Sequence, residues 1–367
     1  MRVLFLTAHP GIHGPLPKLA PMVASGLESC GWEVDIEYWS RHREGESVLE
    51  KVLGRAHDLR TVRRHLKNRP ADVLLVATTH DVPALLRDIP LVLLARRLCP
   101  TIVLHFHGSM CDLLGKSGHR VFSLVSSWLV GLCSAVWLLS NEEIKEWRCF
   151  CPAARFELVR NPFTPPELAA VRPGRDGLWR GPSGLPTLLF VGRLEAPKGV
   201  FDLLSAFALV VRKHPCRLVL VGSGNAALVE RAAAEAGIAD VVELTGYLAG
   251  ESVYRKYAEA DVFVLPSHRE GFPTVIMEAM SFGLPVVTTE IRGAVDVFRQ
   301  ERNVLFVPVG RSDALAAAIL RLLEDQQLRQ DMGERNRAAV KAFTPDVVIP
   351  RYATLLNDSV SRQRGAK

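Results

Sequence analysis

A strand, a loop and a helix are predicted in succession by one stretch of the chain, Val262-Phe263-Val264-Leu265-Pro266-Ser267-His268-Arg269-Glu270-Gly271-Phe272-Pro273-Thr274-Val275-Ile276-Met277-Glu278-Ala279-Met280. Its first four residues form the short apolar run of a buried parallel strand, which Pro266 ends. Pro273 suits the first position of a helix, and Gly283 suits the left-handed residue that closes one. The stretch therefore predicts a strand–loop–helix unit of a parallel sheet.

Two carboxylates of this stretch are predicted to lie near the start of the helix, Glu270 in the loop and Glu278 on the second turn. A helix start presents free N–H groups and a partial positive charge, which suit an anion. Carboxylates repel a phosphate but accept hydrogen bonds from hydroxyl groups, which a sugar supplies. A nucleotide sugar, which combines a diphosphate with a polyol, fits this arrangement. The alternative is that both glutamates are solvated surface acids.

The composition is that of a soluble globular protein with more than one domain. The chain has 367 residues, of which 48% are hydrophobic and 23% are charged, and a chain of this length usually forms two domains. Its net charge of +6 suits a phosphorylated substrate or an anionic membrane but is too small to predict nucleic-acid binding. The seven scattered cysteines include no C-x-x-C pair, so they predict reduced thiols in a cytosol.

The sequence has no predicted signal peptide and no predicted membrane span. Residues 3–6 are too short for the core of a signal peptide, and no small-residue cleavage pattern follows them. Residues 121–139 are apolar but interrupted by serines and a glycine, which predicts a helix followed by a buried strand. We expect a cytoplasmic protein.

Predicted strands and helices alternate along the chain, with one interruption. Apolar runs predict strands at residues 2–7, 33–38, 72–77, 101–106, 188–191, 218–221, 241–244 and 262–265. Between the two groups, residues 161–186 are rich in proline and glycine, which is typical of a linker.

We therefore predict an α/β protein of two doubly wound, Rossmann-like domains. The predicted boundaries are residues 1–160 for the first domain, 161–186 for the linker, 187–345 for the second domain and 346–367 for a C-terminal helical segment. Its tail from Ser359 is expected to be frayed. Ligands of such sheets bind beyond the carboxyl ends of the strands, so the cleft between the domains is the expected site.

Two more loops at predicted strand ends carry binding residues. Residues 192–199 offer the planar guanidinium of Arg193 and the compact charge of Lys198, which suit a diphosphate that gains charge as it leaves. Two solvated surface cations are the alternative. Gly222-Ser223-Gly224 follows another strand, where glycines allow the backbone to approach a ligand closely, although one Gly-x-Gly is a weak signal.

Taken in order, these motifs resemble those of a known enzyme family. They are Arg193 and Lys198, Gly222-Ser223-Gly224, Thr245-Gly246-Tyr247, Pro266-Ser267-x-x-Glu270-Gly271-Phe272-Pro273, Glu278-Ala279-Met280 and Gly283-x-Pro285-Val286-Val287. In this order and spacing the chain resembles the retaining GT-B glycosyltransferases of family 4 (glycosyl transferases group 1). The resemblance implies two Rossmann-like domains facing each other across a cleft, with the helix of residues 346–367 crossing back to the first domain.

The resemblance also implies roles for the residues of the second domain. Arg193 and Lys198 would hold the donor diphosphate, and Glu278 would accept hydrogen bonds from the ribose diol. Glu270 would accept one from a hydroxyl group of the donor sugar. Further donor contacts would come from Gly222, Gly224, Gly271, Phe272 and Thr274. The family usually works without a divalent metal, and no metal-ligand cluster or cofactor site is predicted from this sequence.

The first domain is expected to bind the acceptor. Members of the family often have a histidine at the end of a strand, facing the donor sugar, and His107 matches because Gly108 is predicted to begin the loop. Its role would be hydrogen bonding and orientation, since in the commonly proposed front-face mechanism the leaving phosphate takes the proton. A packed structural histidine is the alternative for His107 and the expectation for His105. Gly14, in a loop that departs from the family pattern, would approach the phosphate or the acceptor.

Residues 55–69 form a basic segment of a predicted helix with one acid, Asp58. Its cations are Arg55, Arg60, Arg63, Arg64, Lys67 and Arg69. A solvated helix face is the interpretation that this segment favours. The alternative is peripheral membrane contact with a lipid-linked acceptor, because near an anionic leaflet each such charge contributes roughly 1 kcal/mol.

Three functions fit the sequence. The preferred one is retaining transfer of a sugar from a nucleotide-diphosphate sugar to a glycan or lipid-linked acceptor, in the synthesis of a cell-surface polysaccharide or glycolipid. The alternatives are a non-catalytic scaffold subunit that binds nucleotide sugars and a nucleotide-sugar epimerase. The four residues Arg193, Lys198, Glu270 and Glu278 favour an enzyme, because a scaffold has no physical need for all of them.

Overall fold

The computed structural model divides into two compact units. It describes residues 1–10, 12, 16–39, 46–170, 184–272 and 274–365. Unit 1 comprises Met1–Phe163 and Phe343–Lys367, and unit 2 comprises Thr164–Ala342. The segment interpreted as a linker, residues 161–186, includes residues 171–183, which lie outside the described part of the chain.

Unit 1 is built on a parallel six-stranded sheet with the order β2-β1-β3-β4-β5-β6. The strands are β1 (Arg2–Thr7), β2 (Glu33–Tyr38), β3 (Val73–His80), β4 (Thr101–Ser109), β5 (Ala135–Leu138) and β6 (Phe156–Leu158). Almost every side chain of β3, β4 and β5 is buried, as expected for strands covered on both faces. The strand order reverses between β1 and β3, where a doubly wound sheet usually binds ligands beyond its carboxyl edge.

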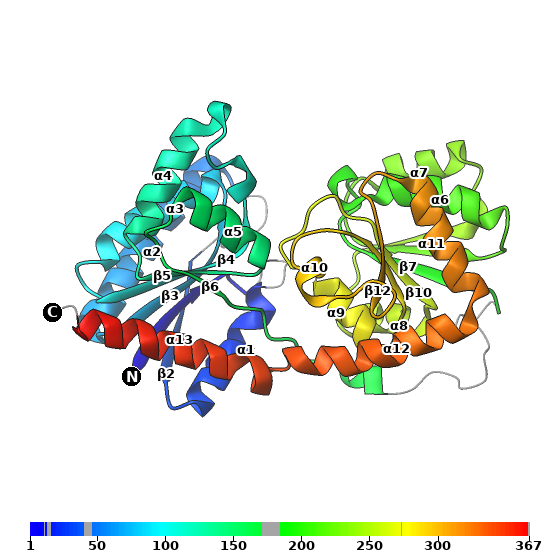
Figure 1. Ribbon diagram of the computed structural model, residues 1–367. Coiled ribbons are helices and arrows are strands. Elements are labelled where there is room, and N and C mark those ends of the chain that lie inside the picture. Colours follow the sequence, from blue (N-terminus) through cyan, green and yellow to red (C-terminus); the bar gives the residue numbers. More distant parts are fainter. Residues whose placement is uncertain (11, 13–15, 40–45, 171–183, 273, 366–367) are drawn as a thin grey trace. The chain divides into compact units, whose positions relative to one another are not determined.

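Helices cover both faces of this sheet (Figure 1). One face carries α2 (Val48–Asn68), α3 (Val82–Ala95), α4 (Arg120–Gly131) and α5 (Asn141–Phe150), whose buried side chains join one apolar core. The other face carries α1 (Leu16–Ser29) and α13 (Pro345–Gly365), which share a second core. The connection from β1 to β2 moves along the sheet in the opposite direction to the connections that follow β3, β4 and β5. Because each crossover is right-handed, α1 lies on the opposite face of the sheet.

The last helix, α13, therefore belongs to unit 1. It packs so closely on α1 that a Cβ atom on Gly26 would lie 2.7 Å from the side chain of Ile349. The helix extends to Gly365. The predicted fraying from Ser359 is wrong, because Ser359 and Val360 are buried against the core of unit 1.

Unit 2 repeats the architecture with a parallel sheet of order β12-β11-β10-β7-β8-β9. Its strands are β7 (Thr187–Val191), β8 (Arg217–Val221), β9 (Val242–Gly246), β10 (Val262–Leu265), β11 (Val286–Thr289) and β12 (Val304–Val307). Its α-helices are α6 (Val200–Val211), α7 (Ala226–Glu235), α8 (Glu251–Glu259), α9 (Thr274–Ser281), α10 (Ala294–Val297), α11 (Ser312–Glu324) and α12 (Gln326–Val340). The predicted fold class, two doubly wound parallel sheets, is confirmed.

Candidate functional site

Three loops that carry predicted site residues follow neighbouring strands of unit 2. The strands β10, β7 and β8 are adjacent in the sheet and parallel. Their carboxyl ends therefore meet at one edge. The loops are residues 266–272 after β10, residues 192–199 after β7 and residues 222–225 after β8; Pro273, predicted as the first position of the helix, lies outside the described residues.

Backbone hydrogen bonds tie these loops to one another. The N–H of Leu194 donates to the carbonyl of Ser223 at 2.8 Å, which joins the loops after β7 and β8. The N–H of His268 donates to the carbonyl of Pro197 at 2.9 Å, which joins the loops after β10 and β7. Since these bonds lie beyond the strands, the loops form one connected layer above the sheet edge.

Two glycines are required where these loops touch. A Cβ atom on Gly222, which has a φ of 152°, would lie 1.8 Å from the carbonyl oxygen of Gly192. A Cβ atom on Gly224, with a φ of 143°, would lie 2.7 Å from the carbonyl oxygen of Leu194. The structure thus explains Gly222 and Gly224 by the close approach of a neighbouring loop, and their contact with a ligand stays a prediction.

Lys198 and Glu270 are brought into direct contact. The Nζ of Lys198 donates to Oε1 of Glu270 at 2.5 Å, and the side chains are 22% and 14% exposed. The hydroxyl of Ser267 donates to the same carboxylate oxygen at 3.0 Å. The sequence predicted both residues as ligand-binding but did not predict that they pair with each other. The 3-10 turn η4 (Ala196–Lys198) and the left-handed Gly199 set the position of the lysine.

Glu278 lies on the second turn of α9 and is half-buried, not a solvated surface acid. The hydroxyl of Tyr257, on α8, donates to its Oε2 at 2.8 Å. Tyr257 is fully buried, and burial together with the negative charge of Glu278 raises the pKa of the phenol well above its ordinary value. Sequence reasoning missed this residue, although the apolar spacing of Val253 and Tyr257 marks the buried face of α8.

Arg193 has an exposed side chain. Its side chain is 66% exposed and pairs with Glu195 at 3.2 Å. The two residues predicted to bind the diphosphate therefore pair with different carboxylates, Arg193 with Glu195 and Lys198 with Glu270. A second pair beside this loop was not predicted: Nε2 of His268 lies 2.6 Å from Oδ2 of Asp202, on the first turn of α6.

The remaining predicted donor contacts lie at the start of α9. Phe272 is buried, Gly271 is partly exposed, and Thr274 is the first residue of the helix. Gly283 closes the helix with a φ of 68°, as predicted. The other predicted residue, Gly14, lies outside the described residues.

His107 of unit 1 lies on β4, which continues to Ser109. The prediction that Gly108 begins a loop is wrong, because β4 stays paired with β3 as far as His80 and Ser109 through an irregularity after Thr78. The predicted core role of His105 is confirmed: its ring is buried, and its Nε2 lies 3.3 Å from the carbonyl oxygen of Val159.

The ring of His107 is held neutral by its surroundings. Burial, followed by the neighbouring His105, lowers its pKa well below the ordinary value, although the side chain of Asn161 favours the charged form. The two histidine rings have centroids 4.1 Å apart. Among the described residues, neither ring nitrogen of His107 makes a hydrogen bond of normal geometry, and the side chain of Asn161 is near enough to act on the ring without forming one. His107 therefore retains an unused donor and an unused acceptor.

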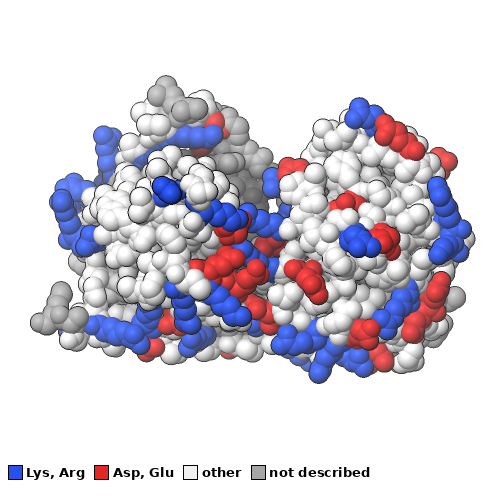
Figure 2. All heavy atoms as spheres, turned by 45° about the horizontal axis from the view of Figure 1, so that its top comes forward, with Lys and Arg blue, Asp and Glu red and all other residues white. Residues whose placement is uncertain are grey.

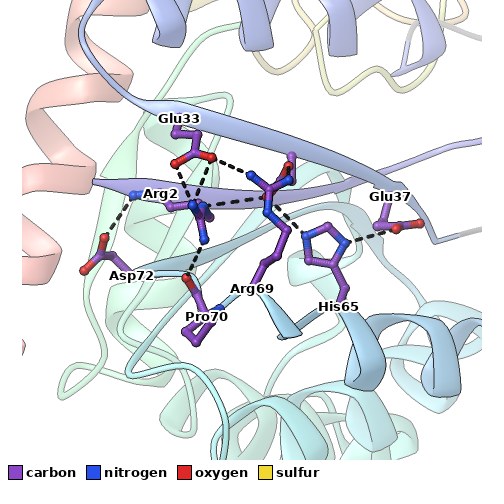
Figure 3. Close-up of polar contacts among 8 residues, drawn as sticks. Arg2, Glu33, Glu37, His65, Arg69, Pro70 and Asp72 are labelled. Carbon is purple, nitrogen blue, oxygen red and sulfur yellow. Dashed lines mark hydrogen bonds and ion pairs between the residues drawn. The ribbon is translucent and has the colours of Figure 1, made fainter. Parts of the chain in front are cut away.

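The basic segment of residues 55–69 is partly neutralised by unit 1 itself. Figure 3 shows Arg69 bound to Glu33, and His65 directed at Glu37. Arg55 pairs with the buried Asp58 at 2.9 Å. The cations of this segment for which the described residues provide no ion pair are Arg60, Arg63, Arg64 and Lys67, all exposed.

Among the described residues, no group of three or more His, Cys, Asp or Glu side chains is arranged to hold a metal ion. All seven cysteines are free thiols. Burial raises the pKa of Cys99 to about 11.

A known protein family matches the unit that carries the three loops. Residues 179–339 match the family model described as "Glycosyl transferases group 1". The matched segment lies within unit 2. The resemblance predicted from the motifs is thereby confirmed at the level of the group.

Two curated relatives each match less than half of the chain. An uncharacterized glycosyltransferase of Methanocaldococcus jannaschii is 33% identical over 144 residues, which cover 39% of this chain and 37% of that protein. The capsular polysaccharide biosynthesis glycosyltransferase CapM of Staphylococcus aureus is 28% identical over 181 residues, which cover 48% of this chain and 47% of CapM. The chain thus spans less than half the length of these relatives.

Solved structures match over both units. Sucrose-phosphate synthase from Thermosynechococcus elongatus aligns with a TM-score of 0.80 at 20% sequence identity. The alignment includes 98% of this chain and 99% of the synthase chain. The Anabaena protein HepE, in complex with UDP-glucose, has a TM-score of 0.73 at 18% identity and covers 98% of this chain and 100% of its own. At these identities the likeness is one of fold, and the fold is GT-B.

Proposed function

We propose that this protein is a retaining glycosyltransferase of family 4 that needs no divalent metal. It transfers a sugar from a nucleotide-diphosphate sugar to a glycan or lipid-linked acceptor, in the synthesis of a cell-surface polysaccharide or glycolipid. The relative CapM is named for capsular polysaccharide biosynthesis, and HepE has been solved with UDP-glucose.

The observation that carries the proposal is the layer of loops above β10, β7 and β8. It places a cation, Lys198, and a carboxylate, Glu270, in contact at the carboxyl edge of a parallel sheet. This edge is where doubly wound sheets bind nucleotides. A diphosphate needs the cation and a sugar needs the carboxylate, so the pair fits a ligand with both parts.

In this proposal Lys198 binds the diphosphate without releasing Glu270. An ammonium group has three N–H donors. One donates to Glu270, and the others remain for phosphate oxygens. Arg193, exposed at the start of the same loop, exchanges Glu195 for the diphosphate and stabilises the negative charge that develops on it.

The two glutamates accept hydrogen bonds from hydroxyl groups of the donor. Glu270 keeps one oxygen on Lys198 and Ser267, and its other oxygen accepts from a hydroxyl of the sugar. Glu278, oriented by Tyr257, accepts from the ribose. Both roles require ionised carboxylates, because a protonated acid loses acceptor capacity.

His107 takes part in transfer as a neutral ring. Its depressed pKa excludes a role as a cation near pH 7 and leaves a hydrogen-bonding role. The proton of the acceptor hydroxyl goes to the leaving phosphate, as the front-face mechanism has it.

The experiment is to incubate the purified protein with a panel of nucleotide-diphosphate sugars, with and without glycolipid acceptors. We expect release of nucleoside diphosphate and a product that keeps the anomeric configuration of the donor, as measured by nuclear magnetic resonance. Donor binding without turnover would instead support a scaffold subunit, and an isomerised donor would support an epimerase. Inversion at the anomeric carbon would contradict the retaining mechanism.

A further inference from the structure

Two neighbouring helices of unit 1, α3 and α4, have apolar outer faces. Large apolar side chains that are exposed in the described residues are concentrated here, although unit 1 has two well-filled cores beneath the helices. The two helices contact each other and lie on the same face of the sheet. Soluble monomers rarely expose neighbouring apolar side chains in this number, so such an area usually marks an interaction surface.

On α4 the exposed apolar residues repeat with helical spacing. Val121, Leu124 and Trp128 are 76%, 70% and 49% exposed. They lie at positions i, i+3 and i+7, so they form a stripe along one side of the helix. The opposite side is anchored in the core by Leu129 and Val130. The stripe is thus a second apolar face, which folding of the unit does not use.

On α3 a similar stripe runs alongside. Val82, Leu86 and Leu93 are exposed, with Leu86 73% exposed. The acid of this helix, Asp88, is buried and accepts hydrogen bonds from Trp39 and Thr78. No carboxylate of α3 therefore interrupts the stripe.

The exposed charged residues at the ends of these helices are cations, whereas the acids nearby, Asp81 and Asp112, are half-buried. Lys116, His119 and Arg120 are exposed at the start of α4, and Arg96 and Arg97 are exposed just after α3. The described residues give none of the four Lys and Arg side chains an ion pair, and residues 113–141 contain no Asp or Glu. Both helices run antiparallel to the strands, so the cations lie at both ends of the apolar area. Figure 2, which turns the top of Figure 1 forward, shows a broad, largely uncharged area on this unit, with Lys and Arg on several sides of it and Asp and Glu on one side.

We propose that the outer faces of α3 and α4 form a docking surface for an anionic lipid bilayer. The side chains of Leu86, Leu124 and Trp128 enter the interface between headgroups and acyl chains, where indole rings are favoured. The cations at the margins bind lipid phosphates. The unit lies on the bilayer rather than through it, since no helix of the described chain has the length and apolar character of a membrane span.

The charges favour a bilayer over a second copy of the chain. In a symmetric dimer the same surface meets itself, which would bring Arg96, Arg97, Lys116 and Arg120 of one copy close to those of the other. An anionic surface neutralises these cations, and each contributes roughly fivefold to binding at low salt. The exposed cations Arg60, Arg64 and Lys67 of the neighbouring α2 add to the same field.

The test is co-sedimentation of the purified full chain with vesicles. One set contains phosphatidylcholine alone, and the other contains two parts phosphatidylcholine to one part phosphatidylglycerol. The stripe variant is Leu86→Gln with Leu124→Gln, and its control is Leu209→Gln with Val309→Gln, exposed apolar residues of unit 2. The charge variant is Lys116→Gln with Arg120→Gln, and its control is Arg231→Gln with Arg255→Gln. All these side chains are exposed, so the fold should persist, which circular dichroism checks.

We expect the wild type and both controls to bind the anionic vesicles and not the neutral ones. The stripe variant should bind at least roughly tenfold more weakly, and the charge variant roughly twentyfold more weakly, with a loss that disappears as salt is raised. Equal binding by all variants, or no binding by the wild type, would overturn the proposal. A wild type that ignores vesicles but forms a dimer that the stripe variant abolishes would assign the surface to a second copy.

This assay needs neither donor nor acceptor. Its outcome is therefore independent of the proposed glycosyl transfer. If both hold, the surface places the enzyme beside lipid-linked acceptors.

Discussion

The two regions that carry predicted site residues satisfy their polar groups in different ways. In unit 2, Lys198, Glu270 and Glu278 each have a partner in the structure. In unit 1, the ring nitrogens of His107 are buried and, among the described residues, unpartnered. The loops after β10, β7 and β8 are therefore a preorganised polar site, whereas His107 retains hydrogen-bonding capacity for which no partner of normal geometry is present among the described residues.

This difference has a thermodynamic consequence. A site whose charges are already paired gains stability from them and needs little rearrangement to bind. A buried histidine without partners lowers stability, since burial of a polar group is costly unless it is hydrogen-bonded. The four predictions below test each side of the comparison.

The largest effect is expected from the loop contacts of unit 2. Gly222→Ala would place a Cβ atom 1.8 Å from the carbonyl oxygen of Gly192, and it should destabilise unit 2 by about 3 kcal/mol or more, since clash and backbone strain add. Urea unfolding followed by tryptophan fluorescence measures the change. The control is Gly237→Ala, which also has a positive φ, of 68°, but no atom within 4 Å of the new methyl group. Equal losses would show that the loops do not constrain each other.

The next effect concerns the cation of the loops after β10, β7 and β8. Lys198→Ala should weaken binding of a nucleoside diphosphate by roughly 1.5–3 kcal/mol, the value of a hydrogen bond to a charged group. Isothermal titration calorimetry measures it. Lys256→Ala is the control, because Lys256 is also ion-paired, to Glu243 at 2.8 Å, and has a similar exposure. An unchanged affinity of the Lys198 variant for the nucleoside diphosphate would show that this loop does not bind the diphosphate.

A smaller effect is expected from the buried histidines of unit 1. Burial lowers the pKa of His105 to about 3, whereas the unfolded chain binds a proton near pH 6.5. Stability should therefore fall as pH falls from 7 to 5, by about 2 kcal/mol for this histidine, because the unfolded state gains the proton and the folded state does not. Hydrogen exchange of the β4 amides at the two pH values measures the change. A His105→Asn variant that keeps the full pH dependence would contradict the assignment.

Much of unit 2 could be predicted from the sequence because its signals are local. A single stretch, residues 262–283, contains the signals for strand, loop and helix end: the run Val262–Leu265, then Pro266, then Gly283. The pairing of Lys198 with Glu270 joins residues 72 positions apart, so no local pattern reveals it. Tyr257 was missed for the same reason, since its hydroxyl meets Glu278 only after α8 and α9 pack.

Unit 1 was harder to predict at the level of single residues. The extent of β4 depends on its pairing with β3 through an irregularity, which the Gly108 signal does not encode. The helix and strand within residues 121–139 were predicted correctly. Their apolar character concealed that Val121, Leu124 and Trp128 face outward, because apolar residues on both sides of a helix carry no periodic contrast.

The central claim is that Lys198 binds the diphosphate of a nucleotide sugar while Glu270 binds its sugar. A comparison of Glu270→Gln with the wild type tests this claim most directly. The amide is a weaker acceptor than the carboxylate but has nearly the same shape. We expect nucleoside diphosphate affinity to stay within about twofold, while the turnover of donor falls by roughly a hundredfold or more. Equal losses of affinity and turnover, or turnover that is unchanged, would contradict the account.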